Sequence, residues 1–261
     1  MEKDVTYSPA LSPYELVDEE KMARLRKTHA WLVEPIYRAS DFVLTMPFFS
    51  WIRSLERPMD FKPAAVQLYY HSATFPKVMG LMLGLTPMAE NPMMPFYAKH
   101  AFGEADHHQL LMAWMLRHGL IESPSELDDV IATIETNACV NLAYQMALEQ
   151  DRSKWLVCLN SGIERCSNDF FKVVAPTMHR LGAGDRYFDV HVEADEHHSI
   201  MGLEHIEPLD PSAPRAQRLV TKALEGISLW AAMLHSWIGM EGFPHFDLTG
   251  QVITPMTPRP F

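Results

Sequence analysis

The chain has 261 residues, of which 48% are hydrophobic and 21% are charged, and its formal net charge is −11. These proportions are ordinary for a globular protein with a large core, and the acidic balance argues against a nucleic-acid-binding surface, which would be rich in Lys and Arg. No apolar run reaches the ~20 residues that a membrane span needs, so we expect no membrane segment. Three cysteines without a CxxC spacing and no recognisable secretory signal favour a reducing, cytoplasmic setting.

Apolar residues recur at helical rather than alternating spacing along most of the chain, which predicts an all-α fold. Proline- and glycine-containing breaks separate the helical segments, as at 58–63, 87–92 and 181–185, because these residues end helices. We predict one domain over residues 1–261, with a polar N-terminal arm at 1–18 and a C-terminal tail at 245–261. The seven predicted helices span residues 20–45, 61–85, 95–118, 125–150, 153–181, 186–206 and 213–241.

The third predicted helix contains the motif Glu-x-x-His. Glu104 and His107 are at i and i+3, the spacing by which helical bundles present a carboxylate and an imidazole to one metal ion. His108, at i+4 from Glu104, is an alternative partner. His100 lies one turn earlier on the same face and is a candidate for contacting the ligands. Such a motif also occurs by chance in helices, so it needs partners elsewhere.

The fifth predicted helix offers a second carboxylate. Glu164 lies in a strongly apolar stretch, two residues after Gly162. A glycine inside a helix costs about 1 kcal/mol relative to alanine, which is reasonable where another part of the chain must approach closely. The alternative interpretation is a surface glutamate paired with Arg165 or Lys172.

The stretch DVHVEADEHHSI, residues 189–200, holds four acids and three histidines. On a helix, His191, Asp195 and His198 fall at i, i+4 and i+7, within about 40° of one another. Glu193, Glu196 and His197 fall off that face. The alternative is a solvated acidic helix with incidental histidines.

Together these helices supply imidazole and carboxylate ligands but no thiolate. Mixed nitrogen and oxygen ligation favours Fe(II), Mn(II) or Zn(II) over Mg²⁺ or Ca²⁺, and the lack of thiolates among the candidate ligands disfavours an iron–sulfur cluster. The candidate metal ligands are Glu104, His107, Glu164, His191, Asp195 and His198.

The order and spacing of the three motifs resemble those of the haem-oxygenase-like di-iron oxidases and oxygenases, and are most similar to the alkene-forming fatty-acid decarboxylases of that family. The similarity extends over about residues 60–240 and includes an aromatic-proline pair, Phe75-Pro76. Some relatives place the first Glu and His seven residues apart; position 111 is Leu here, so the resemblance favours His107.

The resemblance implies a seven-helix haem-oxygenase-like bundle without haem, which binds two Fe(II)/Fe(III) ions and uses O2 as co-substrate. By this pattern Glu104, His107 and His198 hold one iron. Glu164, His191 and Asp195 hold the other, which tends to be bound more weakly, with Glu164 or Asp195 as a bridge. Members of this family N-oxygenate amines, cleave amino-acid side chains or decarboxylate fatty acids.

Polar groups near the expected site favour a small amine or amino-acid-like substrate over a long acyl chain, so we expect N-oxygenation, with oxidative decarboxylation or C–C cleavage as the alternative. An external electron donor is expected as a partner, and apolar Trp230, Trp237 and Ile238 are compatible with a homodimer face. Two other interpretations stay open: a metal-free, thiaminase-like enzyme on the same fold, and a non-catalytic helical metal-binding protein. The candidates for contacting the substrate or the ligands are His71, His100, Tyr144, Arg165 and Asn168.

Overall fold

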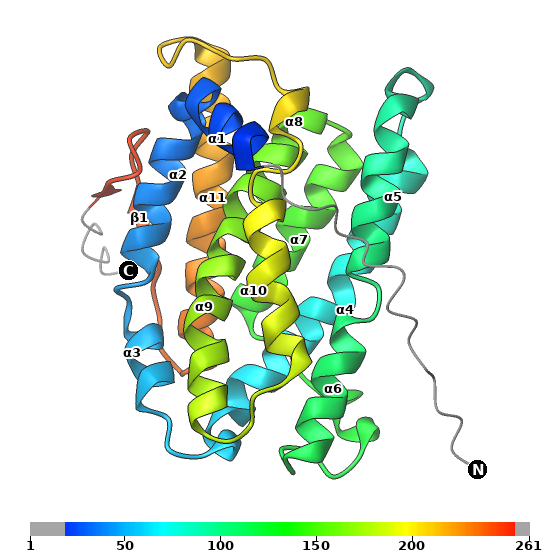
Figure 1. Cartoon of the computed structure of the whole chain (residues 1–261), viewed down its shortest axis with the longest axis vertical. Helices are drawn as coiled ribbons and strands as arrows, with labels where there is room; N and C mark the ends of the chain where they lie inside the picture. Colours follow the sequence, from blue (N-terminus) through cyan, green and yellow to red (C-terminus); the bar gives the residue numbers. More distant parts are fainter. Residues whose placement is uncertain (1–18, 254–261) are drawn as a thin grey trace, which may run out of the picture.

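The structure is a computed structural model that describes residues 19–253, apart from the side chains of residues 193–198. It is a helical bundle in which α2, α9, α10 and α11 run along the long axis, with α4, α5 and α6 on one side (Figure 1). The all-α fold predicted from the sequence is therefore confirmed. The α-helices are α1 (Glu19–Thr28), α2 (Ala30–Val43), α3 (Pro47–Ser54), α4 (Lys62–Leu85), α5 (Met94–Gly103), α6 (His107–Arg117), α7 (Ile134–Glu149), α8 (Arg152–Trp155), α9 (Arg165–Arg180), α10 (Arg186–His198) and α11 (Pro214–Trp237).

Short elements connect these helices. Residues Leu156–Glu164 form a π-helical segment, η4, that joins α8 to α9 without a break. The 3-10 turns are η1 (Pro58–Phe61), η2 (Met88–Met93), η3 (Pro124–Leu127) and η5 (Leu203–His205), and the two strands are β1 (His245–Phe246) and β2 (Val252–Ile253).

The core is built around α11, whose apolar face is buried along its whole length. Trp230 and Trp237 of this helix pack edge-on against Phe170 of α9, with ring centroids 6.3 Å apart in both pairs. Both tryptophans are buried. The expectation that they contribute to a dimer face is wrong for these two residues, because their apolar surface is already used inside the chain.

The π segment packs directly on α11, and two glycines permit the close approach. A Cβ placed on Gly162 would lie 2.9 Å from the Ala223 carbonyl oxygen, and one on Gly226 would lie 2.8 Å from the Cys158 sulfur. Real Cβ atoms do not approach backbone oxygens this closely, so only glycine fits at Gly162. The close approach expected at Gly162 from the sequence is thus present.

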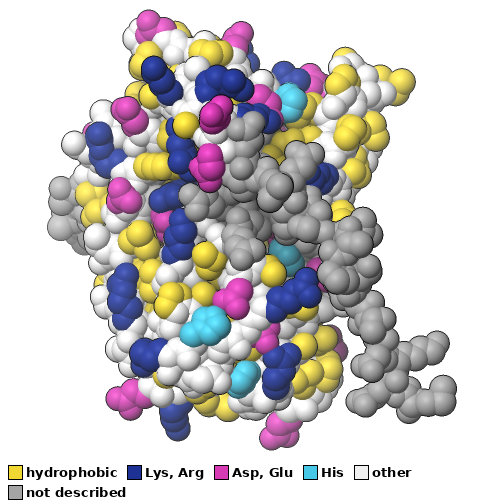
Figure 2. Space-filling model, viewed as in Figure 1, with side chains coloured by type: hydrophobic (Ala, Val, Ile, Leu, Met, Phe, Trp, Pro, Cys, Tyr) yellow, Lys and Arg dark blue, Asp and Glu magenta, His cyan; other side chains and the backbone are white. Residues whose placement is uncertain are grey.

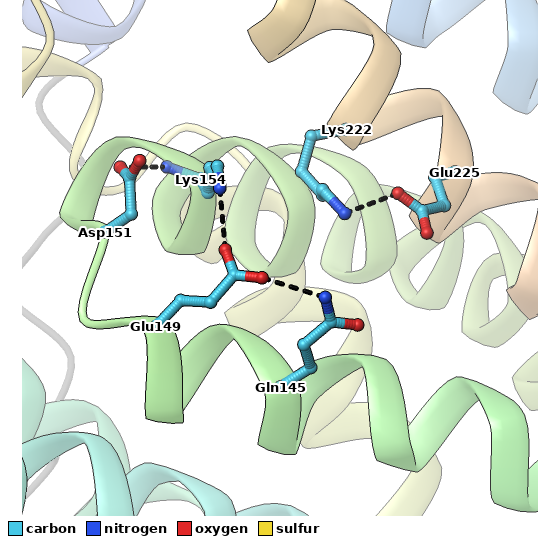
Figure 3. A network of polar contacts seen from close by, with 6 residues as sticks. All are labelled: Gln145, Glu149, Asp151, Lys154, Lys222 and Glu225. Carbon is cyan, nitrogen blue, oxygen red and sulfur yellow. Dashed lines mark hydrogen bonds and ion pairs between the residues drawn. The ribbon is translucent and has the colours of Figure 1, made fainter.

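The corner between α7 and α8 is fixed by polar contacts at the surface (Figure 3). Gln150 has a positive φ of 53°, a conformation in which the helix cannot continue. Asp151 accepts a hydrogen bond from the Lys154 backbone at 3.1 Å, and the Lys154 ammonium lies 2.7 Å from Glu149. Exposed ion pairs of this kind stabilise by less than about 1 kcal/mol, so they set the geometry of the corner more than its stability.

Several predicted boundaries differ from the observed ones. The predicted helix 20–45 is two helices that meet at His29, whose ring lies 2.8 Å from the Ile206 carbonyl. Residues 47–54 form α3, which was not predicted, while α7 begins only at Ile134 rather than near 125. The predicted helix 186–206 ends at His198. The predicted helix 95–118 is broken at residues 104–106, which matters for the site described below.

The predicted C-terminal tail contains a small antiparallel hairpin, formed by β1 and β2. Its turn ends at Gly250, which has φ +77°, and a Cβ there would lie 2.0 Å from the Pro35 carbonyl oxygen of α2. Phe246 also packs edge-on against Phe42 of α2. Residues 245–253 are therefore part of the packed structure, contrary to the expectation of a tail.

No helix among residues 19–253 combines the length and apolar character that a bilayer span requires. On the face shown in Figure 2, basic and acidic side chains are interspersed among apolar ones.

Candidate metal centre

Glu104 and His107 lie on either side of a break between α5 and α6. The Glu104 amide still donates to the His100 carbonyl at 3.1 Å, and α6 begins three residues later at His107. Gly103 and Asp106 flank the break, and both residue types favour helix ends over helix interiors. In spite of the break, the Glu104 Oε2 atom is 2.7 Å from the His107 Nδ1 atom, and both side chains are buried.

His191 reaches the same place from α10. Its Nδ1 atom is 2.5 Å from the Tyr187 carbonyl oxygen, one turn earlier in the helix. Because a carbonyl can only accept, Nδ1 carries the hydrogen and Nε2 keeps its lone pair for a ligand. The ring stacks on Phe171 at 4.1 Å and lies 4.3 Å from the His107 ring. Burial, together with the neighbouring His107, lowers the pKa of His191 to about 3, so its imidazole is neutral near pH 7.

Glu104, His107 and His191 form one potential metal site, with a ligand atom of each within 4.8 Å of the others. Two imidazoles and one carboxylate are the donor set of the non-haem Fe(II) oxygenases, in which three protein ligands leave other coordination positions open. The residues therefore fit iron. The sequence-based grouping differs here, because it placed His191 with Glu164 rather than with Glu104 and His107.

Glu164 lies at the end of the π segment and is 3% exposed. Its Oε1 atom is 2.7 Å from the His100 Nε2 atom, and its Oε2 atom accepts a hydrogen bond of 2.9 Å from the Asn160 side chain. The alternative of a surface glutamate paired with Arg165 or Lys172 is therefore wrong. A π segment is uncommon and often accompanies a functional site.

The two carboxylate–imidazole pairs determine the electrostatics of the site. Burial on its own lowers the pKa of His107 and of His100, but the adjacent Glu104 and Glu164 carboxylates outweigh it, and both pKa values are raised. Burial raises the pKa of Glu164 in spite of the opposing effect of His100. The negative charge of Glu104 favours the protonated forms of both His100 and Glu164 and so also acts to raise their pKa values.

Both carboxylates line one small cavity of about 30 Å³, which is room for about one or two water molecules. His71 of α4 also lines it, between the ring of Phe75 at 5.5 Å and that of Trp230 at 5.4 Å. Burial lowers the pKa of His71 to about 4, although Glu104 opposes the shift. The lining residues are Leu68, His71, Ser72, Phe75, Glu104, Ile163, Glu164, Ser167, Phe171, His191 and Trp230.

The family to which the chain is matched by its sequence agrees with iron as the metal of this site. A model of the haem-oxygenase-like family described as iron-containing redox enzymes matches residues 62–231, which include all five of His100, Glu104, His107, Glu164 and His191. The chain belongs to this family. A search of curated proteins finds none that matches the chain.

Solved structures of other proteins are similar to this chain along most of their length, and one of them is described as having a haem-oxygenase-like fold. A TenA homologue from Pseudomonas syringae pv. tomato has 16% identity and a TM-score of 0.67, covering 81% of this chain and 93% of its own. A domain of unknown function from Shewanella denitrificans has 13% identity and a TM-score of 0.60, with coverage of 86% and 93%. A TenA homologue from Pyrococcus furiosus has 12% identity and a TM-score of 0.56, with coverage of 82% and 97%. At these identities the similarity shows the fold alone.

The other predicted site residues lie outside the cluster of Glu104, His107 and His191 or outside the described side chains. Asp195 and His198 lie outside the described side chains. His108 is half-buried and packs its ring against Tyr69 at 6.0 Å, so it points away from the cluster that contains His107.

Among the described residues, the cavity lining does not include Tyr144, Arg165 or Asn168. Arg165 pairs instead with Asp169 at 2.9 Å and lies over the Tyr37 ring, between α9 and α2. Asn168 donates to the Val192 carbonyl at 3.1 Å and so joins α9 to α10. The expected substrate contact through Arg165 is therefore replaced by an internal ion pair.

Sequence reasoning missed Asn160 and the hydroxyls of Ser72 and Ser167. Asn160 is four residues before Glu164, a spacing that could have indicated a contact along one helix. Ser72 follows His71 directly, and Ser167 lies three residues after Glu164. Small hydroxyl side chains beside a predicted ligand carry too little signal on their own to predict a cavity lining.

Proposed function

We propose that the chain is a non-haem di-iron, O2-dependent oxidase or oxygenase that acts on a small metabolite. The observation that supports this most directly is the pair of buried carboxylate–imidazole contacts, Glu104–His107 and Glu164–His100, which interact electrostatically beside one cavity. Buried carboxylates are costly unless they are paired or bind metal ions. Membership of the iron-containing redox enzymes supports iron as the metal.

In this proposal Glu104, His107 and His191 hold one iron ion, and Glu164 contributes to the second. Bound iron would supply the electrons through which O2 is activated. The Nδ1 contact of His191 with Tyr187 fixes the ring orientation, as is usual for ligating histidines. Phe75, Phe171 and Trp230 line the cavity and give part of its wall an apolar surface.

For the substrate we propose an amine or an amino-acid-like molecule that undergoes N-oxygenation. Among the described residues the cavity lining holds no Lys or Arg, so an uncharged amine nitrogen fits it better than a free carboxylate, which would find no cationic side chain to pair with. Neutral His71 can donate or accept one hydrogen bond to such a nitrogen. N-hydroxylation consumes RNH2, O2, two electrons and two protons and yields RNHOH and H2O, so an external electron donor is part of the proposal.

The thiaminase-like alternative would need a nucleophile in the cavity, and the described lining offers serine hydroxyls but no cysteine. Cys139, Cys158 and Cys166 are all buried, and burial raises the pKa of each thiol. A buried thiol with a raised pKa is a poor nucleophile. This observation favours the iron-dependent reaction.

The neighbouring histidines His107 and His108 provide a matched test. Wild-type protein loaded with Fe(II) without oxygen should retain iron after desalting and consume O2 when a reductant and an amine substrate are added. His107→Gln should lose both properties, with iron affinity at least ~100-fold weaker, because a ligand is removed. His108→Gln should retain both.

Metal analysis and an oxygen electrode measure the two outcomes. Wild-type protein that binds no iron, or His107→Gln protein that binds it as well as wild type, would contradict the proposal. Circular dichroism establishes that each variant is folded.

A further inference from the structure

The contact between His100 and Glu164 has the form of a second half-site. The His100 Nε2 atom and the Glu164 Oε1 atom are 2.7 Å apart. The Glu104 Oε2 and His107 Nδ1 atoms, in the predicted ligand pair, are also 2.7 Å apart. All four side chains are buried. The two pairs thus have the same chemistry, the same spacing and the same degree of burial.

The orientation of Glu164 leaves one oxygen for this contact. Asn160 donates to Oε2 at 2.9 Å, which holds the carboxylate in place while Oε1 is directed to His100. Two ligand atoms that bind one divalent ion at about 2.1 Å each lie about 3 Å apart when they occupy adjacent octahedral positions. The His100–Glu164 separation is therefore close to the spacing of two ligands of one ion.

The second pair is adjacent to the first. Glu104 and Glu164 line the same cavity, and the charge of Glu104 acts on both His100 and Glu164. His100 is at i−4 from Glu104 on the last turn of α5, so α5 and its C-cap contribute one residue to each pair.

We propose that His100 is a ligand of the second iron ion, together with Glu164. This inference rests on the proposed di-iron function and adds a histidine outside the Glu-x-x-His and His-x-x-x-Asp-x-x-His motifs. It also provides an imidazole for the ion that Glu164 binds, since His191 lies with Glu104 and His107. The competing explanation is that His100 only donates a hydrogen bond that positions Glu164.

The substitution His100→Gln separates these two roles. Glutamine keeps a donor that can reach Glu164 but removes the imidazole ligand. Cobalt(II) is the probe, because it binds nitrogen and oxygen ligands as Fe(II) does and absorbs visible light. Full-length wild-type protein is titrated with Co(II) without oxygen, and bound metal is counted by equilibrium dialysis and metal analysis.

We expect two Co(II) ions per wild-type chain and one per His100→Gln chain, with the second binding step weakened by ~100-fold or more. Glu164→Gln should lose the same step, which gives a second variant if His100→Gln is unstable. His108→Gln, which alters a histidine outside both pairs, should bind two ions. Circular dichroism and the melting temperature serve as checks of folding.

Two results would overturn the inference, and they differ from failure of the proposed function. Two ions bound to His100→Gln with wild-type affinities would assign His100 to hydrogen bonding alone, while the di-iron function stands. Loss of the second ion in His108→Gln as well would show that the loss is not specific to His100. Wild-type protein that binds fewer than two ions would contradict the di-iron proposal itself.

Discussion

At the scale of single residues, hydrogen bonds decide which atoms face the metal centre. His191 gives its Nδ1 hydrogen to the Tyr187 carbonyl, and Asn160 engages one oxygen of Glu164. Each contact leaves one atom of the side chain for an ion: Nε2 of His191 and Oε1 of Glu164. The ligands are therefore oriented by contacts that do not require a metal, which lowers the entropy lost when an ion binds.

His71 should make the metal-free protein less stable in mild acid. The pKa of His71 is about 4 in the folded chain, compared with ~6.5 in an unfolded chain. As pH falls from ~6.5 to ~4, His71 takes up a proton in the unfolded chain but stays neutral in the folded chain. The free energy of unfolding should fall over this window by up to ~3 kcal/mol from this residue alone.

The substitution His71→Gln removes the titrating imidazole, so the free energy of unfolding should vary less with pH in this variant. Urea unfolding of wild-type and variant protein at several pH values between ~4 and ~7 measures the difference. Equal slopes in the two proteins would show that His71 does not titrate in this way.

At the scale of the elements, the site depends on irregular helices. The break at residues 104–106 lies between Glu104 and His107, and the π segment ends at Glu164. The π segment also contains Gly162, where the chain meets the Ala223 carbonyl of α11. The position of Glu164 is thus tied to the packing of η4 on α11.

Replacing Gly162 by Ala should destabilise the protein although alanine is the better helix former. The added Cβ would meet the Ala223 carbonyl oxygen at 2.9 Å, and overpacking of this kind costs ~1–3 kcal/mol. Gly80 of α4 is the matched control, since nothing lies within 4 Å of a Cβ there. Gly80→Ala should raise the free energy of unfolding by ~0.5–1 kcal/mol. Chemical denaturation of both variants measures the two changes in the free energy of unfolding, which should have opposite signs. A Gly162→Ala protein more stable than wild type would contradict the close packing of η4 on α11.

The sequence predicted the helical class and the long regular helices better than the irregular ones. The expected helices 61–85 and 213–241 correspond to α4 and α11, because proline starts and apolar periodicity are local signals. The break after Gly103 and the π segment depend on tertiary packing, which local propensity does not report. The spacing of Glu and His along single helices is also a local signal, so the candidate ligands could be predicted from the sequence. The contact between Glu164 and His100 could not, because it depends on how the fold brings α5 and η4 together.

At the scale of the whole molecule, the candidate centre joins distant parts of the chain. Glu104, Glu164 and His191 come from the α5–α6 break, η4 and α10. Metal ions bound by these side chains would link the segments, and they would do so in the folded state alone. Binding to the folded state raises stability by mass action.

Metal binding should therefore raise the melting temperature. At a free Fe(II) concentration about 100 times the dissociation constant, the gain is ~2.7 kcal/mol, or roughly 5–10 °C for a chain of this size. Differential scanning calorimetry without oxygen measures the shift. Glu104→Gln protein should show a much smaller one, and an equal shift in this variant would place the ion elsewhere.

The three cysteines should report on global unfolding. Cys139, Cys158 and Cys166 are free and buried, and burial raises the pKa of Cys139 and of Cys166 to about 12. The thiolate is the reactive form, so a disulfide reagent should label essentially no thiol in the folded protein at pH 8 and all three after denaturation. Absorbance of the released thiol dye gives the count, and rapid labelling of the native protein would show that the core opens locally.

The interruption between α5 and α6 also has a consequence for how an ion arrives at ligands that are wholly enclosed. In an unbroken helix the backbone fixes the distance between residues three apart, so Glu104 and His107 could not move apart without the loss of backbone hydrogen bonds. Because Glu104 caps α5 and His107 begins α6, we expect that a small movement of α5 relative to α6 can change their separation and leave the backbone hydrogen bonds within both helices intact. The rates at which metal binds and dissociates should then depend on this movement of α5 relative to α6, and a bound ion should restrict it.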